Sequence, residues 1–409
     1  MPILGLKSKG PTTPAHFALE PLIRPNILSL VPYRAARDDY SDGVLLDANE
    51  NAYGPSLAAD FGKLASTDAG AATLNLLSEA ERAVLNRYPS PTHDDLKRRI
   101  AALRNLPNED WVFLGVGSDE VIDMLYRVLC VPGKDAAITT PPTYGMYAVS
   151  AQINDVGVVK VPLVLEDGAF QLDEEKLDAA FKATPNAKLL FICSPGNPTG
   201  TLIPLDAIKR IASNPNFKGV IVVDEAYIDF APEGTSAVTL VKEYANIAVS
   251  QTLSKSFGLA AIRLGYLLAS PELIQILTNA KAPYNVSLPT ASLALASVSE
   301  SGLAVMQKNT ATLVANRTAL IDGLLKIPAI GRVPGGNHAN FVLAEVLDKP
   351  GGKPDNARAN AIYKEMAENR GVVVRFRGNE PGCLACLRIT VGTEEENATA
   401  LARLSELLQ

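Results

Sequence analysis

The sequence predicts an α/β protein in which a mostly parallel β-sheet lies between helices and a smaller α+β domain follows. Two observations support this prediction. Short aliphatic and β-branched runs alternate with helical patterns through the middle of the chain, as in a parallel sheet that helices cover on both faces. After Pro289 the pattern changes to a long alanine-rich helical region followed by separate strands, which indicates a second domain.

Length and composition narrow the class of protein. The 409 residues suffice for two or three domains, and 47% hydrophobic with 20% charged residues is typical of a soluble globular enzyme. The net charge of −6 gives no long-range attraction for nucleic acid or an anionic membrane, and no apolar run is long enough to cross a bilayer. Because residues 1–14 lack the apolar segment of a secretory signal, we expect the protein in the cytoplasm.

The cysteines predict neither a disulfide framework nor a metal site. Cys383 and Cys386 have the spacing of half a zinc site, but no second pair is present and the three histidines lie far away in sequence. We therefore expect no metal, whereas redox pairing of these two cysteines stays open.

The N-terminal region predicts a leader and an arm. Residues 1–20 are rich in Pro, Thr, Gly and Lys and are expected to form a mobile leader. Prolines between Arg24 and Tyr33 favour an extended arm, of the kind that packs on a partner. A short apolar strand at 44–46 then runs into a turn with Asn, Gly and Pro.

Two helices and a strand come next. Apolar residues recur at helical spacing from Leu74 to Leu85 and again from Asp94 to Leu103. Val112–Val116 predicts a strand, and a Gly-Ser-Asp sequence at 117–119 follows at the expected start of a helix. The backbone N–H groups of such a helix start can bind a phosphate, although glycines before helices are also common caps.

Five further runs predict the other strands of the sheet: Ala136–Thr140, Val158–Val161, Leu189–Cys193, Val220–Asp224 and Ile247–Ser250. Ligands of such sheets bind at the carboxyl ends of the strands. Polar motifs follow four of these runs: Pro-Pro-Thr-Tyr-Gly at 141–145, Ser-Pro-Gly-Asn-Pro-Thr-Gly at 194–200, Asp-Glu-Ala-Tyr at 224–227 and Ser-Lys at 254–255. Because the four motifs share one edge of the predicted sheet, we expect them to form one ligand site.

The stretch around Lys255 contains the residue on which the predicted site depends. Thr252 and Ser254 offer hydroxyl groups for phosphate oxygens, and Arg263 can bind two of those oxygens with its planar fork. A lysine that forms a Schiff base has to be shielded from water and oriented toward its reaction partner in advance. The alternative for this stretch alone is an exposed lysine in a polar loop.

The region after Pro289 predicts a separate α+β domain. Its expected elements are a helical region at Thr290–Leu325, strands around Asn340–Leu343, Val372–Arg375 and Leu387–Gly392, and a terminal helix at Glu394–Leu408.

Together these motifs resemble the fold-type I pyridoxal-phosphate enzymes of the class I and II aminotransferases, over nearly the whole chain from Arg24. Six motifs are similar to the histidinol-phosphate branch of that family: Pro32-Tyr33, Asn86-Arg87-Tyr88-Pro89, Gly117-Ser118-Asp119-Glu120, Pro141-Pro142-Thr143-Tyr144-Gly145-Met146-Tyr147, Asp224-Glu225-Ala226-Tyr227-Ile228 and Cys386-Leu387-Arg388-Ile389-Thr390-Val391-Gly392-Thr393. The resemblance implies a large domain at 76–289 with a mixed, mostly parallel seven-stranded sheet. It also implies a small α+β domain from 41–75 and 290–409, and a leader and arm at 1–40.

The resemblance implies pyridoxal 5′-phosphate as the cofactor and gives most motifs a role. Lys255 would carry the cofactor and then act as the general base on the substrate Cα. Asp224 would pair with the pyridinium nitrogen and Tyr144 would stack on the ring. Tyr227 and Asn197 would hydrogen-bond the phenolic oxygen.

The remaining cofactor residues would hold its phosphate through N–H groups, hydroxyls and a guanidinium: Gly117, Ser118, Asp119, Thr252, Ser254, Arg263 and, from a neighbouring subunit, Tyr88. The last of these implies a homodimer with shared active sites.

The implied reaction transfers an amino group between L-histidinol phosphate and 2-oxoglutarate, giving imidazole acetol phosphate and L-glutamate in histidine biosynthesis. Arg388 and Arg375, with Tyr33 from the arm, would bind the substrate phosphate, and Asn197 would also face the substrate. Arg388 would bind the carboxylate of glutamate too, since one guanidinium fork suits both anions.

Other interpretations stay open. Within the same fold type, the chain could be an aromatic or broad-range aminotransferase or a phosphothreonine decarboxylase. A non-catalytic regulatory module with this fold would keep the architecture but has no need of Lys255. A dinucleotide-binding protein is disfavoured because no third glycine follows Gly115 and Gly117. Single residues also have plain structural readings: a helix cap for Asp224, a turn for Asn197, a core aromatic for Tyr227 and a buried ion pair for Arg388.

Overall fold

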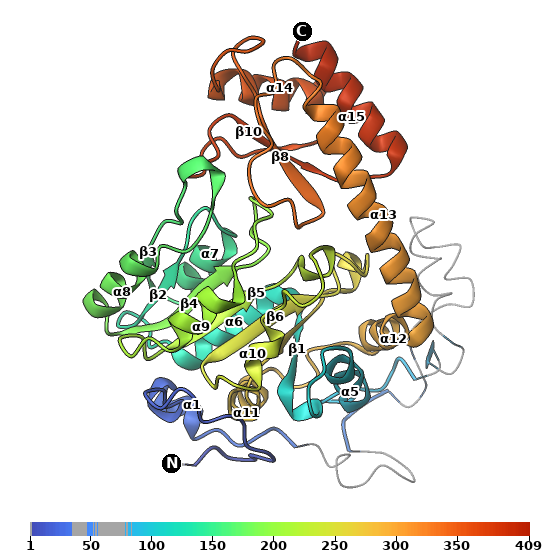
Figure 1. Ribbon diagram of the computed structural model, residues 1–409. Helices are drawn as coiled ribbons and strands as arrows, with labels where there is room; N and C mark the ends of the chain where they lie inside the picture. The colour runs from blue at the N-terminus through green and yellow to red at the C-terminus, as the bar shows by residue number, and fades with distance from the viewer. Residues whose placement is uncertain are drawn as a thin grey trace.

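The computed structural model describes residues 2–34, 47–51, 53, 55, 78, 81–82 and 84–409. A seven-stranded sheet forms the middle of the molecule and a three-stranded sheet lies above it, as Figure 1 shows. The large sheet consists of β1 (Val112–Val116), β2 (Ala136–Thr139), β3 (Gly157–Lys160), β4 (Ala187–Cys193), β5 (Val220–Asp224), β6 (Ile247–Thr252) and β7 (Leu264–Leu268).

The strand order of the large sheet is β1-β7-β6-β5-β4-β2-β3. Strands β2 to β6 pair in parallel, whereas β7 runs antiparallel to both β6 and β1. The prediction of a mixed, mostly parallel seven-stranded sheet is therefore confirmed. Parallel pairing brings the carboxyl ends of β4, β5 and β6 to one edge, next to one another.

Helices cover both faces of this sheet, because alternate residues of each strand point to opposite sides. Leu190 and Ile192 of β4 enter one core, and Leu189 and Phe191 enter the other. The first core also contains residues of α5 (Asp94–Leu103), α8 (Glu174–Ala183), α9 (Leu205–Ala212), α10 (Val238–Val241) and α12 (Leu288–Ser297). The second contains residues of α6 (Gly117–Leu129), α7 (Met146–Ile153) and α11 (Pro271–Ala280).

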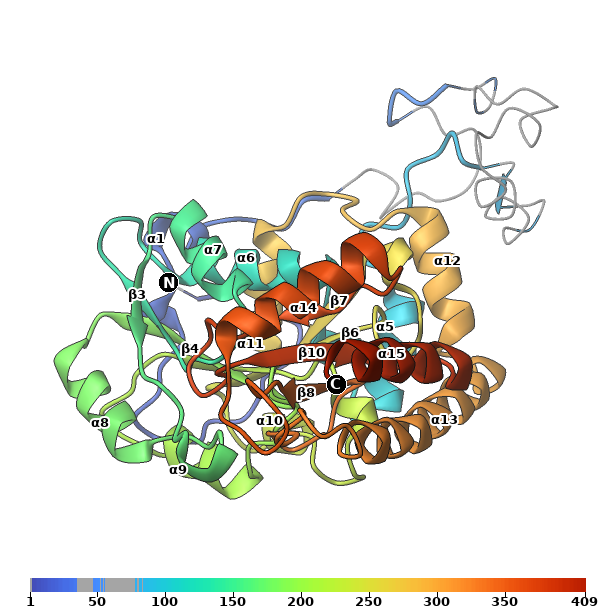
Figure 2. The same ribbon diagram turned by 90° about the horizontal axis from the view of Figure 1, so that it is seen from above.

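The smaller sheet is antiparallel and has the order β8-β10-β9. Its strands and helices are α13 (Glu300–Leu324), β8 (Phe341–Glu345), α14 (Asn356–Asn369), β9 (Arg375–Phe376), β10 (Cys386–Thr390) and α15 (Glu394–Leu407). Side chains of the three helices, including Leu320, Met366 and Leu404, pack with the sheet in a separate core. Figure 2 shows this layer from above, over the large sheet.

Two loops join the large domain to the smaller one. The Gly336 N–H donates to the Thr201 hydroxyl at 2.9 Å, and the His338 N–H donates to the Gly200 carbonyl at 2.8 Å. Gly335 has a positive φ of 95°, and a Cβ at this position would lie 1.9 Å from the Thr199 carbonyl oxygen. Only glycine can therefore occupy this contact.

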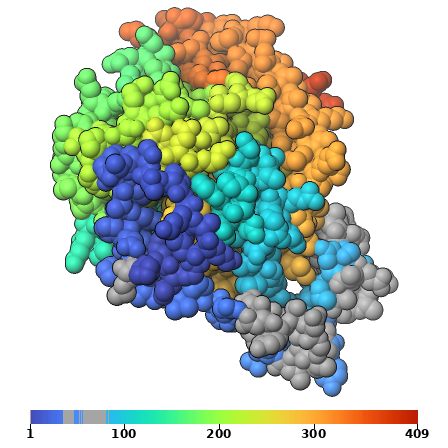
Figure 3. Space-filling view, turned by 60° about the horizontal axis from the view of Figure 1, so that its bottom comes forward, coloured from blue at the N-terminus to red at the C-terminus, as the bar shows by residue number. Residues whose placement is uncertain are grey.

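The prediction of a mobile leader is wrong for residues 2–20. Ile3 enters the core beside α6 and α11, Leu6, Phe17 and Leu19 pack against that core, and Figure 3 shows the first residues as a compact patch on the surface. Apolar side chains spaced among the polar residues supply this packing. The arm is also not fully extended, since Pro25 starts a one-turn helix, α1 (Pro25–Leu28), as proline can at a first helical position.

Other boundaries differ from the sequence predictions. The region Thr290–Leu325 is two helices, because Ser299 ends the first pattern and caps α13 by accepting from the Gly302 N–H. Of the strand predicted at Val372–Arg375 only Arg375 pairs, together with Phe376 just beyond it, and α14 was not predicted. The predicted strand at 44–46 and most of the predicted helix 74–85 and of segment 41–75 lie outside the described residues.

Among the described residues, short 3-10 helices connect these elements: η3 (Glu109–Trp111), η4 (Glu166–Gly168), η5 (Ile228–Phe230) and η6 (Ala260–Ile262), and η1 (Glu20–Leu22) precedes α1. No helix in the described part of the chain is both long and apolar enough to cross a bilayer.

Candidate active site

A cavity of about 190 Å³ lies at the carboxyl ends of the central strands. Its lining comes from every polar motif that the sequence placed there: Ser118, Asp119, Tyr144, Cys193, Asn197, Asp224, Ala226, Tyr227, Thr252, Ser254, Lys255, Ala260 and Arg263. These residues span nearly 150 positions of the chain, and the parallel strand order is what brings them together.

Lys255 lies in the loop between β6 and β7 and is half-buried. Its Nζ lies 5.6 Å from the centre of the Tyr227 ring. Burial lowers the pKa of Lys255, and the positive charge of Arg388 lowers it further, against the opposing effect of Asp224. A lysine with a lowered pKa spends more time as the neutral amine, which is the nucleophilic form.

Asp224 is the last residue of β5 and is only 3% exposed. Its carboxylate accepts from the Tyr147 hydroxyl at 2.6 Å and from the Ala226 N–H at 3.1 Å. Burial raises the pKa of Asp224, and the hydrogen bond from Tyr147 opposes that rise. Since a carboxylate can accept about four hydrogen bonds, Asp224 can still bind a proton donor in the cavity.

Tyr147 is a functional candidate to which sequence reasoning gave no role. It is fully buried, stacks on Phe191 at 4.6 Å between ring centres, and lies edge-on to Tyr144 at 5.6 Å. The available signal was its place in the motif at 141–147: Tyr144 lies just before α7 and Tyr147 is the second residue of that helix, so the two rings meet at the helix start.

The residues expected around a cofactor ring are in place. Tyr144 borders the cavity and donates its hydroxyl to Asp119 at 3.1 Å. Asn197 and Tyr227, which follow β4 and β5, are each 7% exposed. The Asn197 side-chain oxygen accepts from Arg388 Nη1 at 2.7 Å, which connects the cavity to the smaller sheet.

The residues expected around a phosphate also meet. Ser118 and Asp119 occupy the first turn of α6, and Arg263 Nη2 lies 3.5 Å from Asp119. Gly117 has a positive φ of 72°, and a Cβ there would lie 2.5 Å from Arg263 Nη2. The Thr252 hydroxyl lies 2.9 Å from the Ser254 hydroxyl, so N–H groups, two hydroxyls and a guanidinium face one space.

Three arginines lie in or directly beside the smaller sheet, and one of them, Arg388, contacts Asn197 of the cavity. Arg388 of β10 is directly opposite Arg375 of β9, so both side chains lie on one face of the sheet, and Arg377 follows two positions later. Burial lowers the pKa of Arg388, and Arg377 lowers it further. No carboxylate in the described part of the chain forms an ion pair with Arg388, so the buried ion pair considered above is not found there. Sequence reasoning did not single out Arg377.

Tyr33 and Tyr88 do not line the cavity around Lys255. The Tyr88 ring stacks on Tyr284 at 4.7 Å between centres, and Tyr33 meets the same ring edge-on at 5.8 Å. Each of the two side chains is 55% exposed. Within one chain they form an aromatic cluster on the surface.

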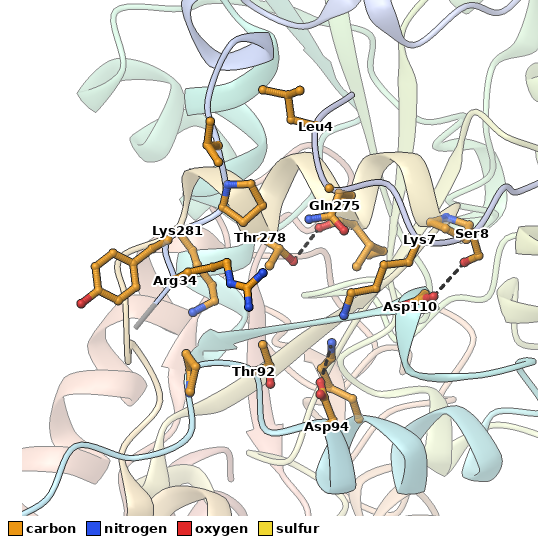
Figure 4. Close-up of a pocket in the computed structure, with 18 of the residues that line it drawn as sticks. Leu4, Lys7, Ser8, Arg34, Thr92, Asp94, Asp110, Gln275, Thr278 and Lys281 are labelled. Carbon is orange, nitrogen blue, oxygen red and sulfur yellow. Dashed lines mark hydrogen bonds and ion pairs between the residues drawn. The ribbon is translucent and has the colours of Figure 1, made fainter. Parts of the chain in front are cut away.

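A second cavity, of about 690 Å³, lies between the leader, the start of α5 and α11. Figure 4 shows Lys7, Arg34 and Lys281 pointing into it. It is larger, but Tyr33 is its only predicted site residue, so we place the chemistry in the cavity around Lys255. No cluster of metal-ligating side chains occurs among the residues that the structure describes.

Comparison with known proteins gives a consistent result. Residues 41–404 match the family described as aminotransferase class I and II. The histidinol-phosphate aminotransferase of Schizosaccharomyces pombe is 46% identical over 401 residues, which cover 96% of this chain and 98% of the relative. The enzyme of that name from Saccharomyces cerevisiae is 42% identical, with the same coverage.

Solved structures are similar at lower identity. The histidinol-phosphate aminotransferase from Sinorhizobium meliloti in complex with pyridoxal-5′-phosphate is 24% identical, with a TM-score of 0.69 over 88% of this chain and 89% of that one. The L-threonine-O-3-phosphate decarboxylase from Porphyromonas gingivalis is 17% identical, with a TM-score of 0.64 over 86% of this chain and 98% of that one. At these identities the similarity concerns the fold.

Proposed function

Because the chain belongs to the class I and II aminotransferase family, we propose that it transfers the amino group of L-histidinol phosphate to 2-oxoglutarate, with pyridoxal 5′-phosphate as cofactor. The products are imidazole acetol phosphate and L-glutamate, and the reaction is reversible. The observation that carries this proposal is the 46% identity over almost the full length of a histidinol-phosphate aminotransferase. As an enzyme of histidine biosynthesis, the protein is proposed to work in the cytoplasm.

The cavity around Lys255 fits the proposed cofactor. Its lysine has a lowered pKa, its floor carries a buried carboxylate, and the start of α6 with Arg263 forms a phosphate cradle. Lys255 would hold the cofactor and Asp224 its ring nitrogen. When bound, pyridoxal phosphate supplies an electron sink for the bond that breaks at the substrate Cα.

The chain's own residues would then divide the work. Asp224 would keep a proton at the ring nitrogen, since its charge is stabilised by two hydrogen bonds. Lys255 Nζ would take the proton from the substrate Cα, a task that a lowered pKa suits. Asn197 and Tyr227 would bind the phenolic oxygen, and Tyr144 would cover the ring face. Gly117 and the cradle residues would hold the phosphate: Ser118, Asp119, Thr252, Ser254 and Arg263.

The arginines of the smaller sheet would select the substrate. Arg388 is half-buried and has two arginine neighbours but no carboxylate partner among the described residues, so an anion would relieve an unfavourable charge. The phosphate of histidinol phosphate and the carboxylate of glutamate can both occupy its planar fork. Arg375, which is exposed, adds positive charge that favours the phosphate more.

The test of this function compares two amino donors, histidinol phosphate and phenylalanine, with 2-oxoglutarate as acceptor. Higher turnover with phenylalanine would contradict the proposal. Arg375→Ala should impair histidinol phosphate more than glutamate, and Arg388→Lys should impair both, because lysine keeps the charge but not the fork. Unchanged turnover of histidinol phosphate in the Arg388→Lys enzyme would remove the assignment of that arginine.

The proposal includes a homodimer in which Tyr88 and Tyr33 reach the partner's site. Both rings lie away from the cavity of their own chain and are half exposed, which supports this assignment. Mixing Tyr88→Phe chains with Lys255→Ala chains should then restore one intact site per mixed dimer. If subunit exchange occurs and no activity returns, the shared site is wrong.

We also propose that the catalytic unit consists of a large domain at 76–289, a small domain from 41–75 and 290–409, and an arm at 1–40. The separate sheets at 112–268 and 341–390 support this division.

A further inference from the structure

A chain of polar groups lies beside Lys255 but outside the cavity. The Ser256 hydroxyl donates to Asp229 Oδ2 at 2.5 Å, and Arg104 Nη2 donates to Asp229 Oδ1 at 2.9 Å. The side chains of Arg104 and Asp229 are each 14% exposed, and Ser256 is 7% exposed. Arg104 Nη2 also lies 3.4 Å from the hydroxyl of Tyr266 in β7. Neither Ser256, Asp229 nor Arg104 lines the cavity around Lys255.

These three residues connect separate parts of the large domain. Arg104 directly follows α5, Asp229 lies in η5 two residues after Tyr227, and Ser256 directly follows Lys255. Asp229 thus joins the turn that carries Tyr227 to the loop that carries Lys255, and Arg104 holds Asp229 from a third direction.

Few hydrogen bonds hold residues 255–257 of the lysine loop to the rest of the domain. Backbone hydrogen bonds close the loop on itself, from the Gly258 N–H to the Lys255 carbonyl at 3.0 Å and from the Leu259 N–H to the Leu253 carbonyl at 3.0 Å. Within the described chain, the bond from Ser256 is the only hydrogen bond that joins residues 255–257 to another segment.

The energetics favour a fixed arrangement. A buried carboxylate is costly unless it is paired, and Asp229 has both a guanidinium and a hydroxyl as donors. Hydrogen bonds to a charged acceptor are stronger and more directional than neutral ones. A serine held in this way cannot rotate without leaving the carboxylate short of a donor, and the backbone at Lys255 is held with it.

We propose that Arg104, Asp229 and Ser256 are positioning residues that aim Lys255. This inference rests on the proposed function, in which one lysine both carries the cofactor and takes a proton from the substrate Cα. Proton transfer by a misplaced base is slow even where binding is unaffected. The three residues touch neither cofactor nor substrate and act through the backbone of the lysine loop.

The test uses the full-length holoenzyme and two variants, Ser256→Ala and Asp229→Asn. We expect kcat to fall about tenfold or more while KM for histidinol phosphate changes less than about threefold. We also expect the pH midpoint of the absorbance change of the Lys255–cofactor linkage to move in both variants. The double variant should be no worse than the worse single variant, because both changes break one chain of contacts.

Ser236→Ala is the matched control. The Ser236 hydroxyl donates to the buried Glu225 carboxylate at 2.6 Å, so this change removes a similar bond elsewhere in the large domain. It should lower the urea midpoint of unfolding by an amount similar to that in Ser256→Ala, but leave kcat and the absorbance titration unchanged.

The outcomes separate the two proposals. If the unmodified protein shows no cofactor bound to Lys255, the proposed function fails. If it does, but Ser256→Ala and Asp229→Asn titrate like the unmodified protein, positioning of Lys255 is overturned. The inference is likewise overturned if the two changes have independent, multiplicative effects on kcat, or if Ser236→Ala causes the same shift of the titration. Because Asp229→Asn breaks the chain at a second point, the test survives the failure of one variant to fold.

Discussion

Replacing Tyr147 with phenylalanine removes the hydroxyl that donates to Asp224 at 2.6 Å and leaves the ring in place. Asp224 then keeps only the longer bond from the Ala226 N–H, at 3.1 Å. A hydrogen bond to a buried charged group contributes about 1.5–3 kcal/mol. We expect the cofactor-free Tyr147→Phe protein to lose about this much free energy of unfolding at pH 8, where Asp224 has the most ionised character.

The loss should depend on pH in a defined direction. Burial raises the pKa of Asp224 above its value in the unfolded chain, so Asp224 contributes less stability as pH rises through its folded-state pKa. Removing Tyr147 raises that pKa further. The difference between variant and unmodified protein should therefore be smaller at pH 5 than at pH 8, because protonation of Asp224 at lower pH removes the charge that the Tyr147 hydroxyl stabilises.

Tyr126→Phe is the matched control for this prediction. Tyr126 is also fully buried beside Phe191, but its hydroxyl donates to the neutral carbonyl of Tyr147 at 2.9 Å. Removing this hydroxyl should lower the free energy of unfolding by about 1 kcal/mol at both pH 5 and pH 8. Urea unfolding of both variants at pH 5 and pH 8 measures the difference. Equal, pH-independent losses in the two variants would refute the reasoning about Asp224.

The same change should slow the holoenzyme. In the proposed site, the Asp224 carboxylate without the Tyr147 hydroxyl would be a stronger base, so it would draw the shared proton away from the cofactor nitrogen and weaken the electron sink. We expect kcat to fall about tenfold, which corresponds to about 1.4 kcal/mol, with little change in KM. A change confined to KM would place Tyr147 in substrate binding instead.

Three further predictions concern stability and cofactor affinity. Burial raises the pKa of Glu225 to about 7 from its ordinary 4.5, so stability should fall as pH rises through this window, and Glu225→Gln should flatten that slope in urea titrations; an equal slope would contradict it. Burial lowers the pKa of Lys281 from 10.5 to about 8, so stability should rise between these pH values, and Lys281→Met should abolish the rise in thermal melts. A Cβ at Gly265 would lie 2.3 Å from the Ser118 nitrogen, so Gly265→Ala should displace the start of α6. We expect cofactor affinity, measured by equilibrium titration, to fall about tenfold or more. Unchanged affinity would show that the cradle tolerates the shift.

Much of the large domain was predictable because its strands are buried on both faces. The run Val220–Val223 is continuously apolar, and the strand predicted at Val220–Asp224 has the same bounds as β5. By contrast, β7 follows Arg263 within the motif that was interpreted as a ligand loop, so its apolar residues were not assigned to a strand. Its antiparallel direction depends on a short connection through η6, which periodicity does not reveal.

The site was predictable where a residue type has one obvious chemical use. Lys255, Asp224 and Arg388 are charged residues in or after apolar runs, and such residues stand out in a sequence. Tyr147 and Asp229 do not, because a tyrosine in a helix and an aspartate in a turn are most often structural. Their contacts with Asp224 and Ser256 arise only when β4, β5 and β6 lie side by side.

For the leader, the sequence predicted mobility where the structure shows packing. Composition rich in proline and glycine indicated mobility, yet Ile3 is buried and the Gly10 N–H donates to the Glu272 carboxylate at 3.0 Å. Composition averages over a segment, whereas packing depends on where its few apolar side chains fall.

The paired loops at 199–201 and 335–338 constrain any re-engineering of this enzyme. A chimaera that imported the smaller sheet of a relative, to change which anion it accepts, would bring a foreign sequence against Thr199, where only a glycine fits. The loop that carries Asn197 would lose its hydrogen bonds from Gly336 and His338 at the same step. The two loops therefore have to be exchanged together, and the junctions of any chimaera made to change specificity have to lie outside both loops.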